Sequence, residues 1–126
     1  MEMGQPVTVD LLKAFLAAFN RHDLDEIMTF FTDQAVFDMP RGPYPWGTRA
    51  EGLGEVRRLL ATRFDGLPDV HYSEDRHFVC EDRGVSEWLL TGTTPAGARI
   101  AVRGCDLFEF VGGRISRKDS YWKIVE

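Results

Sequence analysis

Residues 103–126 read RGCDLFEFVGGRISRKDSYWKIVE and carry the strongest structural signal in the chain. Apolar and polar residues alternate on both sides of Gly112 and Gly113, a pattern typical of a β-hairpin with glycine in its turn. A three-residue loop at 111–113 places Asp106 directly opposite Lys118. One face of the hairpin then carries Val102, Gly104, Asp106, Phe108, Phe110, Ser116, Lys118, Ser120 and Trp122. A carboxylate and an ammonium therefore stand on a face with several apolar side chains.

This polar pair has two interpretations. Opposite residues on neighbouring antiparallel strands have Cβ atoms ~5 Å apart, so the two charges can meet. At ~4 Å their attraction is roughly 4 kcal/mol with an effective dielectric near 20. Since a pocket wall is only partly desolvated, we expect Asp106 to stay ionised. Either the pair lines a cavity, with Asp106 as base or acceptor and Lys118 steadying negative charge, or it is a structural ion pair.

The opposite face of the same hairpin suits a partly polar contact surface. It carries Leu107, Glu109, Ile115, Arg117, Asp119 and Tyr121. Cys105 points to this side as well, because it neighbours Asp106 in the strand.

Two helices are predicted at the start of the chain and a third further on. The first has apolar residues at helical spacing behind Thr8, which suits an N-cap: Leu11, Leu12, Phe15, Leu16 and Phe19. Asp23 precedes a glutamate by three residues, the signature of a capping box, and predicts a second, shorter helix. Thr48 repeats this signature with Glu51 and predicts a third helix through Phe64.

The remaining segments are strands and loops. Residues 35–39 form a short strand with Ala35, Phe37 and Met39 on one face and Asp38 on the other. The stretch PRGPYPWG, residues 40–47, is a loop because proline and glycine interrupt regular structure. Its Tyr44 and Trp46 form either a lid or a hydrophobic plug. Four alternating runs follow at 70–82, 84–94, 98–110 and 113–125.

Helices and strands are therefore segregated, which defines the α+β class. The 126 residues suit one domain, residues 1–126, with a real core. We expect a strongly bent antiparallel sheet wrapped around three N-terminal helices, enclosing the phenylalanine-rich faces.

Composition narrows the function classes. The net charge of -5 and the scattered basic residues argue against nucleic acid. No apolar run approaches the ~20 residues that span a bilayer, and no basic leader precedes an apolar stretch, so we expect a cytoplasmic protein without membrane contact. Cys80 and Cys105 are expected to be free, mostly buried thiols. No ligand spacing favours a metal, and no motif favours a cofactor.

The strings FLAAFNRHDLDEIMTFFTDQAVFDMPRG, CDLFEFVGGRI and SYWK resemble the nuclear-transport-factor-2-like superfamily, most closely its SnoaL-like and ketosteroid-isomerase-like group. The resemblance covers nearly the whole chain. It implies a cone-shaped α+β fold with an apolar pocket at its open end and a homodimer through the outer sheet face. The group includes isomerases, cyclases, dehydratases and proteins without a reaction, so fold alone does not assign function.

The resemblance also separates this chain from true ketosteroid isomerases. Their first-helix tyrosine corresponds to Phe15, their base to Met39, and their late-strand aspartic acid to Asp106. A phenylalanine cannot donate a hydrogen bond and a methionine cannot move a proton, so the usual isomerisation mechanism is disfavoured. A one-residue bulge would turn Asp38 inward instead, and this alternative stays open.

Several residues remain ambiguous from sequence. His22 lies between two helices and is expected to be solvated, whereas His71 and His77 are expected on the same side of one strand, in a pocket or at an edge. Glu87 and Trp88 are neighbours, so one faces inward and the sequence does not choose.

The sequence thus predicts a pocket protein for a small apolar or ring-containing ligand. Asp106 and Lys118 are the candidate catalytic residues of an isomerase, cyclase or dehydratase. The candidate ligand-binding residues are Phe15, Phe19, Phe37, Met39, Tyr44, Trp46, Phe108 and Trp122. The alternatives are a non-catalytic ligand-binding module and a protein-interaction module of the same fold.

Overall fold

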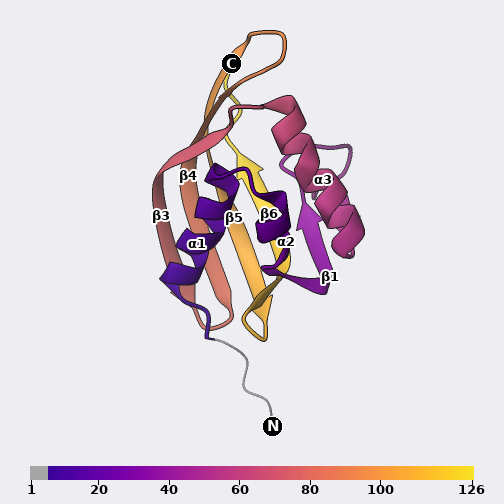
Figure 1. The fold of residues 1–126 in the computed structure, drawn as a ribbon, viewed down its shortest axis with the longest axis vertical. Coiled ribbons are helices and arrows are strands. Elements are labelled where there is room, and N and C mark those ends of the chain that lie inside the picture. The colour runs from indigo at the N-terminus through magenta and orange to yellow at the C-terminus, as the bar shows by residue number, and fades with distance from the viewer. Residues whose placement is uncertain (1–5) are drawn as a thin grey trace.

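A computed structural model describes residues 6–126 as three helices and a six-stranded sheet (Figure 1). The helices are α1 (Val9–Asn20), α2 (Leu24–Met28) and α3 (Leu53–Gly66). The strands are β1 (Phe31–Asp38), β2 (Arg49–Glu51), β3 (His71–Cys80), β4 (Arg83–Thr93), β5 (Arg99–Val111) and β6 (Arg114–Trp122). The α+β class predicted from the sequence is confirmed.

The first two helices begin where the capping signals predict. The Thr8 side chain accepts a hydrogen bond from the Leu11 N–H at the start of α1. Asp23 does the same for the Glu26 N–H at the start of α2. Each bond satisfies a backbone donor that has no partner within the helix.

The third helix begins later than the sequence predicts. Residues 49–51 form strand β2, which pairs with β1, so Thr48 is not an N-cap. The residue before α3 is Gly52, whose φ of 86° lies in the left-handed region that glycine adopts readily. The capping-box signature was misleading because pairing with β1 satisfies the backbone of this segment instead.

The sheet has the strand order β2-β1-β6-β5-β4-β3. Its pairs are antiparallel except for β1 and β6, which run parallel. The expectation of a purely antiparallel sheet is therefore wrong at one pair. A parallel pair needs a long crossover connection, and here β2, α3, β3, β4 and β5 lie between β1 and β6 along the chain.

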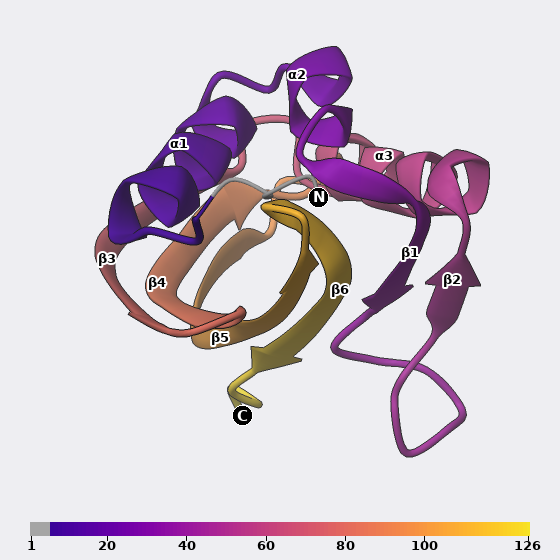
Figure 2. The same ribbon diagram turned by 90° about the horizontal axis from the view of Figure 1, so that it is seen from below.

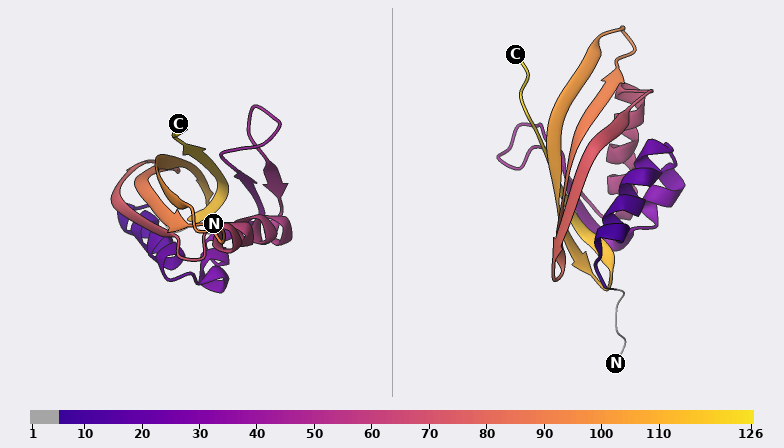
Figure 3. Two further views of the ribbon diagram at one scale, coloured as in Figure 1. Left: turned by 90° about the horizontal axis from the view of Figure 1, so that it is seen from above. Right: turned by 90° about the vertical axis from the view of Figure 1, so that its left-hand side faces the viewer.

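The sheet is strongly bent, and all three helices lie on its concave side (Figures 2 and 3). The buried core fills the space between them and includes Leu12, Phe15, Phe19, Phe37, Trp88, Phe108 and Ile115. Phe15 contacts four other phenylalanine rings edge-on, with centroid distances of 5.1–5.6 Å. The predicted cone-like wrapping of the sheet around the helices is confirmed.

The β5–β6 hairpin differs from the predicted register. Its loop has two residues, because Gly112 and Gly113 both have positive φ and Val111 pairs with Arg114. A bulge then leaves Ser116 unpaired, between the pairs Phe110–Ile115 and Glu109–Arg117.

The shorter loop and the bulge together shift the pairing of β6 with β5 by two residues from the predicted register, for all residues beyond the bulge. Asp106 lies opposite Ser120, and Lys118 lies opposite Phe108. Since side chains alternate with period two, every residue from 117 onward keeps its predicted face. Ile115 is the exception: it lies before the bulge and is buried, not on the outer face.

Candidate active site

A buried polar cluster of Asp106, Lys118 and Ser120 lies on the concave face of β5 and β6. Lys118 Nζ donates to Asp106 Oδ1 over 3.0 Å and to Ser120 Oγ over 2.8 Å. Ser120 Oγ in turn donates to Asp106 Oδ1 over 2.5 Å. Their exposed fractions are only 3%, 5% and 6%, so this ion pair is removed from bulk water.

Trp88 supplies another donor to the carboxylate. Its Nε1 donates to Asp106 Oδ2 over 3.1 Å, and the residue is 1% exposed. The indole lies against Gly104, where a Cβ atom would come within 2.6 Å of the ring and 2.4 Å of the Tyr121 carbonyl oxygen. The structure therefore places Trp88 inward and Glu87 outward, a choice that the sequence left open.

Aromatic rings surround the lysine ammonium. Lys118 Nζ lies 4.6 Å from the centroid of the Phe37 ring and 5.6 Å from that of Phe19. Tyr72 packs edge-on against Trp88, with centroids 5.0 Å apart. These rings exclude water and also stabilise the cation through their π faces.

Burial controls protonation in this region. It lowers the pKa of Lys118 below the ordinary value of 10.5, the Asp106 carboxylate opposes this change, and the positive charge of Arg63 adds to it. Burial also raises the pKa of Tyr72 above the ordinary 10.0. The Tyr72 hydroxyl therefore keeps its proton at neutral pH and can act as a hydrogen-bond donor.

The predicted ligand-binding residues separate into three groups. Phe15, Phe19, Phe37 and Phe108 are buried in the core, at most 3% exposed. Met39 and Trp122 are partly buried against that core. Tyr44 and Trp46 are exposed and stack on each other, with centroids 5.3 Å apart, on a loop that projects away from the curved sheet (Figure 2).

Asp38 lies on the face of β1 opposite to Phe37 and therefore outside the candidate site. It is fully buried there, because Arg49 from β2 and Arg117 from β6 bind its two carboxylate oxygens at 2.7 and 2.8 Å. The bulge that would have turned Asp38 inward is absent at this position, where pairing with β2 is regular.

The histidines of β3 lie on opposite faces, contrary to the sequence prediction. A register shift between Ser73 and Arg76, with Glu74 at a φ of 51°, reverses the alternation. His71 is exposed, whereas the His77 side chain is 1% exposed.

His77 bridges two polar side chains on the concave side. Its Nε2 lies 2.6 Å from Asp75 Oδ2, and its Nδ1 lies 2.8 Å from Ser86 Oγ. A carboxylate only accepts, so Nε2 carries a proton and the Ser86 hydroxyl donates to Nδ1 when the ring is neutral. Ser86 pairs with Asp106 across β4 and β5, which extends the polar surface toward β3.

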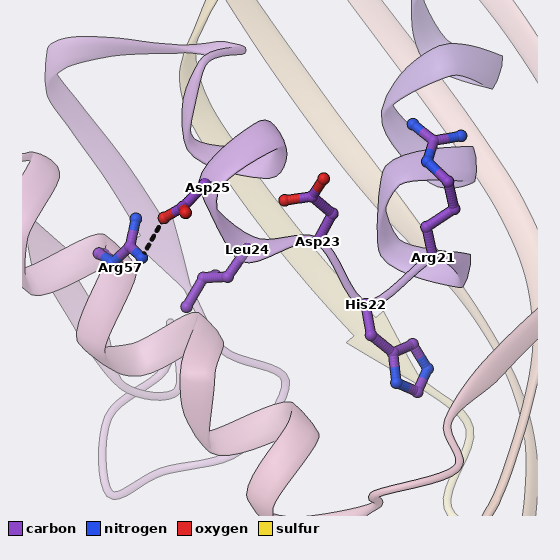
Figure 4. A pocket seen from close by; sticks show the side chains of 6 residues that line it. All are labelled: Arg21, His22, Asp23, Leu24, Asp25 and Arg57. Atoms are coloured by element: carbon purple, nitrogen blue, oxygen red, sulfur yellow. Dashed lines mark hydrogen bonds and ion pairs between the residues drawn. The ribbon is translucent and has the colours of Figure 1, made fainter.

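A separate open hollow of about 470 Å³ lies between the α1–α2 connection and α3 (Figure 4). Its lining is charged and self-paired: Arg57 and Asp25 form an ion pair across it, and Arg21 pairs with Glu26. His22 is not simply solvated, since its Nε2 lies 2.6 Å from the Val70 carbonyl oxygen. These groups already satisfy one another, which gives the hollow no evident chemistry.

The cysteines are free, as expected, but not mostly buried: Cys80 is exposed and Cys105 is half-buried. Within residues 6–126 no set of three or more His, Cys, Asp or Glu side chains is arranged to hold a metal ion. No helix of this part of the chain is long and apolar enough to cross a membrane.

The sequence analysis missed the contributions of Trp88, Tyr72 and Ser86 to this cluster. One signal was available: a glycine in the middle of an alternating strand indicates close approach by another group. Gly104 is such a glycine, and Trp88 is the group that approaches it.

Fold and site together define a small α+β domain with an aromatic concave face and one buried acid–lysine pair. The SnoaL-like domain family matches residues 12–118, so this chain belongs to that family. No curated protein sequence matches the chain.

Solved structures of similar proteins share the fold at low sequence identity. A candidate polyketide cyclase from Xanthomonas campestris pv. campestris is 21% identical with a TM-score of 0.79, over 90% of this chain and 88% of that one. An NTF2-like protein of unknown function from Mesorhizobium loti is 23% identical with a TM-score of 0.75, over 91% and 89%. TerC, co-crystallised with polyporic acid, is 18% identical with a TM-score of 0.77, over 91% and 90%.

Proposed function

We propose that this protein binds a small ring-containing molecule against its concave face and performs acid–base chemistry on it, as an isomerase, cyclase or dehydratase. The observation that carries this proposal is the Asp106–Lys118 ion pair, buried among aromatic rings on that face. A buried ion pair is weak evidence for stability alone, because desolvation offsets much of its attraction.

The chemical roles follow from the groups present. Asp106 is the acceptor for a substrate proton, and rotation of the Ser120 hydroxyl can free one acceptor position on Oδ1, the oxygen that Lys118 also binds. Lys118, held at 3.0 Å from the carboxylate, stabilises negative charge that develops on the substrate. Tyr72 keeps its proton and offers a hydrogen-bond donor from β3.

Two of the structural relatives support a ring-containing ligand. One is described as a candidate polyketide cyclase, and TerC was crystallised with polyporic acid. Each likeness is below 25% identity, so it supports the ligand class by analogy of fold alone.

The test begins with mass spectrometry of small molecules extracted from the purified protein. Proton NMR of the identified ligand in D₂O then follows deuterium uptake and product formation. Asp106→Asn should slow the reaction by about 10²–10⁴, the usual contribution of a positioned base. Asp33→Asn, an exposed residue of β1, is the matched control and should leave the rate unchanged. An unchanged rate in Asp106→Asn would refute the catalytic assignment.

The second candidate function is a non-catalytic binding module. It is favoured by the fact that no buried side-chain nitrogen or oxygen in the described residues lacks a hydrogen-bond partner, so the cluster needs no substrate to complete it. Ligand retention without turnover in the wild type would select this function. A homodimer and a cytoplasmic location also stay predictions.

A further inference from the structure

Two arginines converge on Trp122 at the end of β6. The Arg63 guanidinium carbon lies 4.5 Å from the centroid of the indole ring, and that of Arg41 lies 5.7 Å away. Arg63 comes from the last turn of α3, and Arg41 comes from the loop after β1. Segments far apart in sequence therefore bring two positive charges to one half-buried ring.

Neither guanidinium is neutralised by a carboxylate of the described chain, residues 6–126. Arg49 and Arg117 both bind Asp38, and Arg57 and Arg58 each bind an acidic neighbour. Within the same residues, no ion pair within 4.0 Å includes Arg41 or Arg63. Unpaired positive charge at Trp122 is notable because the whole chain carries a net charge of -5.

This positive region adjoins the candidate active site. The positive charge of Arg63 adds to the lowering of the Lys118 pKa and opposes the rise that burial causes in the Tyr72 pKa, which agrees with the position of Arg63 over Trp122 at the end of β6. Trp122 of β6 lies opposite Gly104 of β5 in the strand pairing. The Trp88 ring packs against the same glycine, and its indole N–H donates to Asp106. The positive charge of Lys118 is already neutralised by Asp106. The positive charge that a ligand can bind therefore comes from the two guanidinium groups.

We propose that Arg41, Arg63 and Trp122 bind the carboxylate end of a planar, ring-containing organic acid. Guanidinium groups bind carboxylates through paired, charge-assisted hydrogen bonds, and the contact with the indole ring holds both guanidiniums in place. The acid group of the ligand lies between Arg41 and Arg63, and its ring extends toward Tyr72 and Lys118. This inference rests on the proposed function, since it names the substrate class of that same site.

The probe for this site is 2-naphthoate, and its uncharged counterpart of the same shape is 2-naphthamide. Titration of ¹⁵N-labelled full-length protein should shift the indole N–H signal of Trp122, assigned by its loss in Trp122→Phe. We expect the naphthoate to bind at least tenfold more tightly than the amide, equal to about 1.4 kcal/mol. Salt should reduce this preference, because part of it arises from exposed charge.

Arg63→Gln and Arg41→Gln should each weaken naphthoate binding at least threefold, and the double variant should bind acid and amide equally. Arg63→Lys keeps the charge and should retain part of the preference. Arg76→Gln is the matched control, because Arg76 is exposed on β3 and likewise has no carboxylate partner within the described residues. Thermal melting verifies that every variant is folded.

The outcomes separate this inference from the proposed function. Equal binding of acid and amide, with signal shifts at Trp88 and Trp122, would overturn the carboxylate assignment and leave the proposed binding of a ring at the concave face intact. No binding of either probe would count against both. Acid preference that survives the double variant would place the anion elsewhere and refute the roles of Arg41 and Arg63.

Discussion

At the scale of single residues, Lys118 shows how a charged side chain can be held inside this fold. Its ammonium has two hydrogen-bond acceptors, Asp106 and Ser120, and two aromatic faces near it. Asp106 in turn has donors from Lys118, Ser120 and Trp88. The pair is stable because nearly all of its hydrogen-bond donors and acceptors have partners, which is the condition for burying charged groups.

Removing the ammonium should therefore be costly. Lys118→Met keeps the length of the side chain but leaves the Asp106 carboxylate buried without a cation. We expect a loss of about 3 kcal/mol in the free energy of unfolding at neutral pH, measured by urea denaturation. Lys123→Met, at an exposed site after β6, is the control and should change stability little. Equal stability of the two variants would show that the pair is not buried as described.

The same variant tests the pH dependence. Burial lowers the pKa of Lys118 in the folded state, whereas the unfolded chain holds that proton up to about 10.5. Between these two values the unfolded state binds more protons, so the free energy of unfolding gains a term that rises with pH. The stability difference between wild type and Lys118→Met should thus increase through this alkaline window, and a decrease would contradict the direction of the shift.

At the scale of elements, Asp38 joins three strands on the outer side of the sheet. Its carboxylate binds Arg49 of β2 and Arg117 of β6, and Arg49 also lies 5.1 Å from the centroid of the Trp46 ring. The short strand β2 and the loop before it are therefore attached to β1 by this cluster in addition to their backbone pairing.

Asp38→Asn should loosen that attachment. The amide loses the negative charge that both arginines share, so we expect about 2–3 kcal/mol of destabilisation. Hydrogen exchange should increase first at β2. Asp33→Asn, an exposed change on the same strand, is the control and should have little effect. Because Asp38 faces away from the Asp106 cluster, naphthoate binding by the folded variant should match wild type, and a weakened site would contradict this placement.

At the scale of the whole molecule, the convex face of the sheet is only partly polar. Leu107 and Tyr121 are 41% and 52% exposed there, and Phe78 on β3 is 55% exposed. Phe78, Val85 and Leu107 form a row across β3, β4 and β5 through consecutive strand pairs. Such a face is suited to pair with a second copy across a two-fold axis.

We expect light scattering at micromolar concentration to give twice the chain mass of 14.3 kDa. Leu107→Lys places a charge at the β5 end of the apolar row and should produce monomers. Ile124→Lys changes an equally apolar residue beyond β6, 88% exposed, and should leave the dimer intact. A monomeric wild type would refute the dimer.

By itself the sequence determined the class, the order of all elements except β2, and the faces of most strand residues. Three of these signals are local: the helical spacing that follows Thr8, the Asp23 cap and the alternation in β3–β6. Local patterns can be recognised from a single sequence. The inward positions of Asp106, Phe108, Lys118 and Ser120 were predicted correctly even though the register was wrong, because a slip of two residues preserves the face.

Only the tertiary structure decided which side chains meet. The two-residue glycine turn and the bulge at Ser116 set Asp106 against Ser120, and the bulge in β3 set His71 and His77 on opposite faces. The strand β2, the parallel pairing of β1 with β6 and the convergence of Arg41 and Arg63 on Trp122 all depend on contacts between distant segments. Such contacts depend on the packing of the whole chain, and no local pattern in the sequence encodes them.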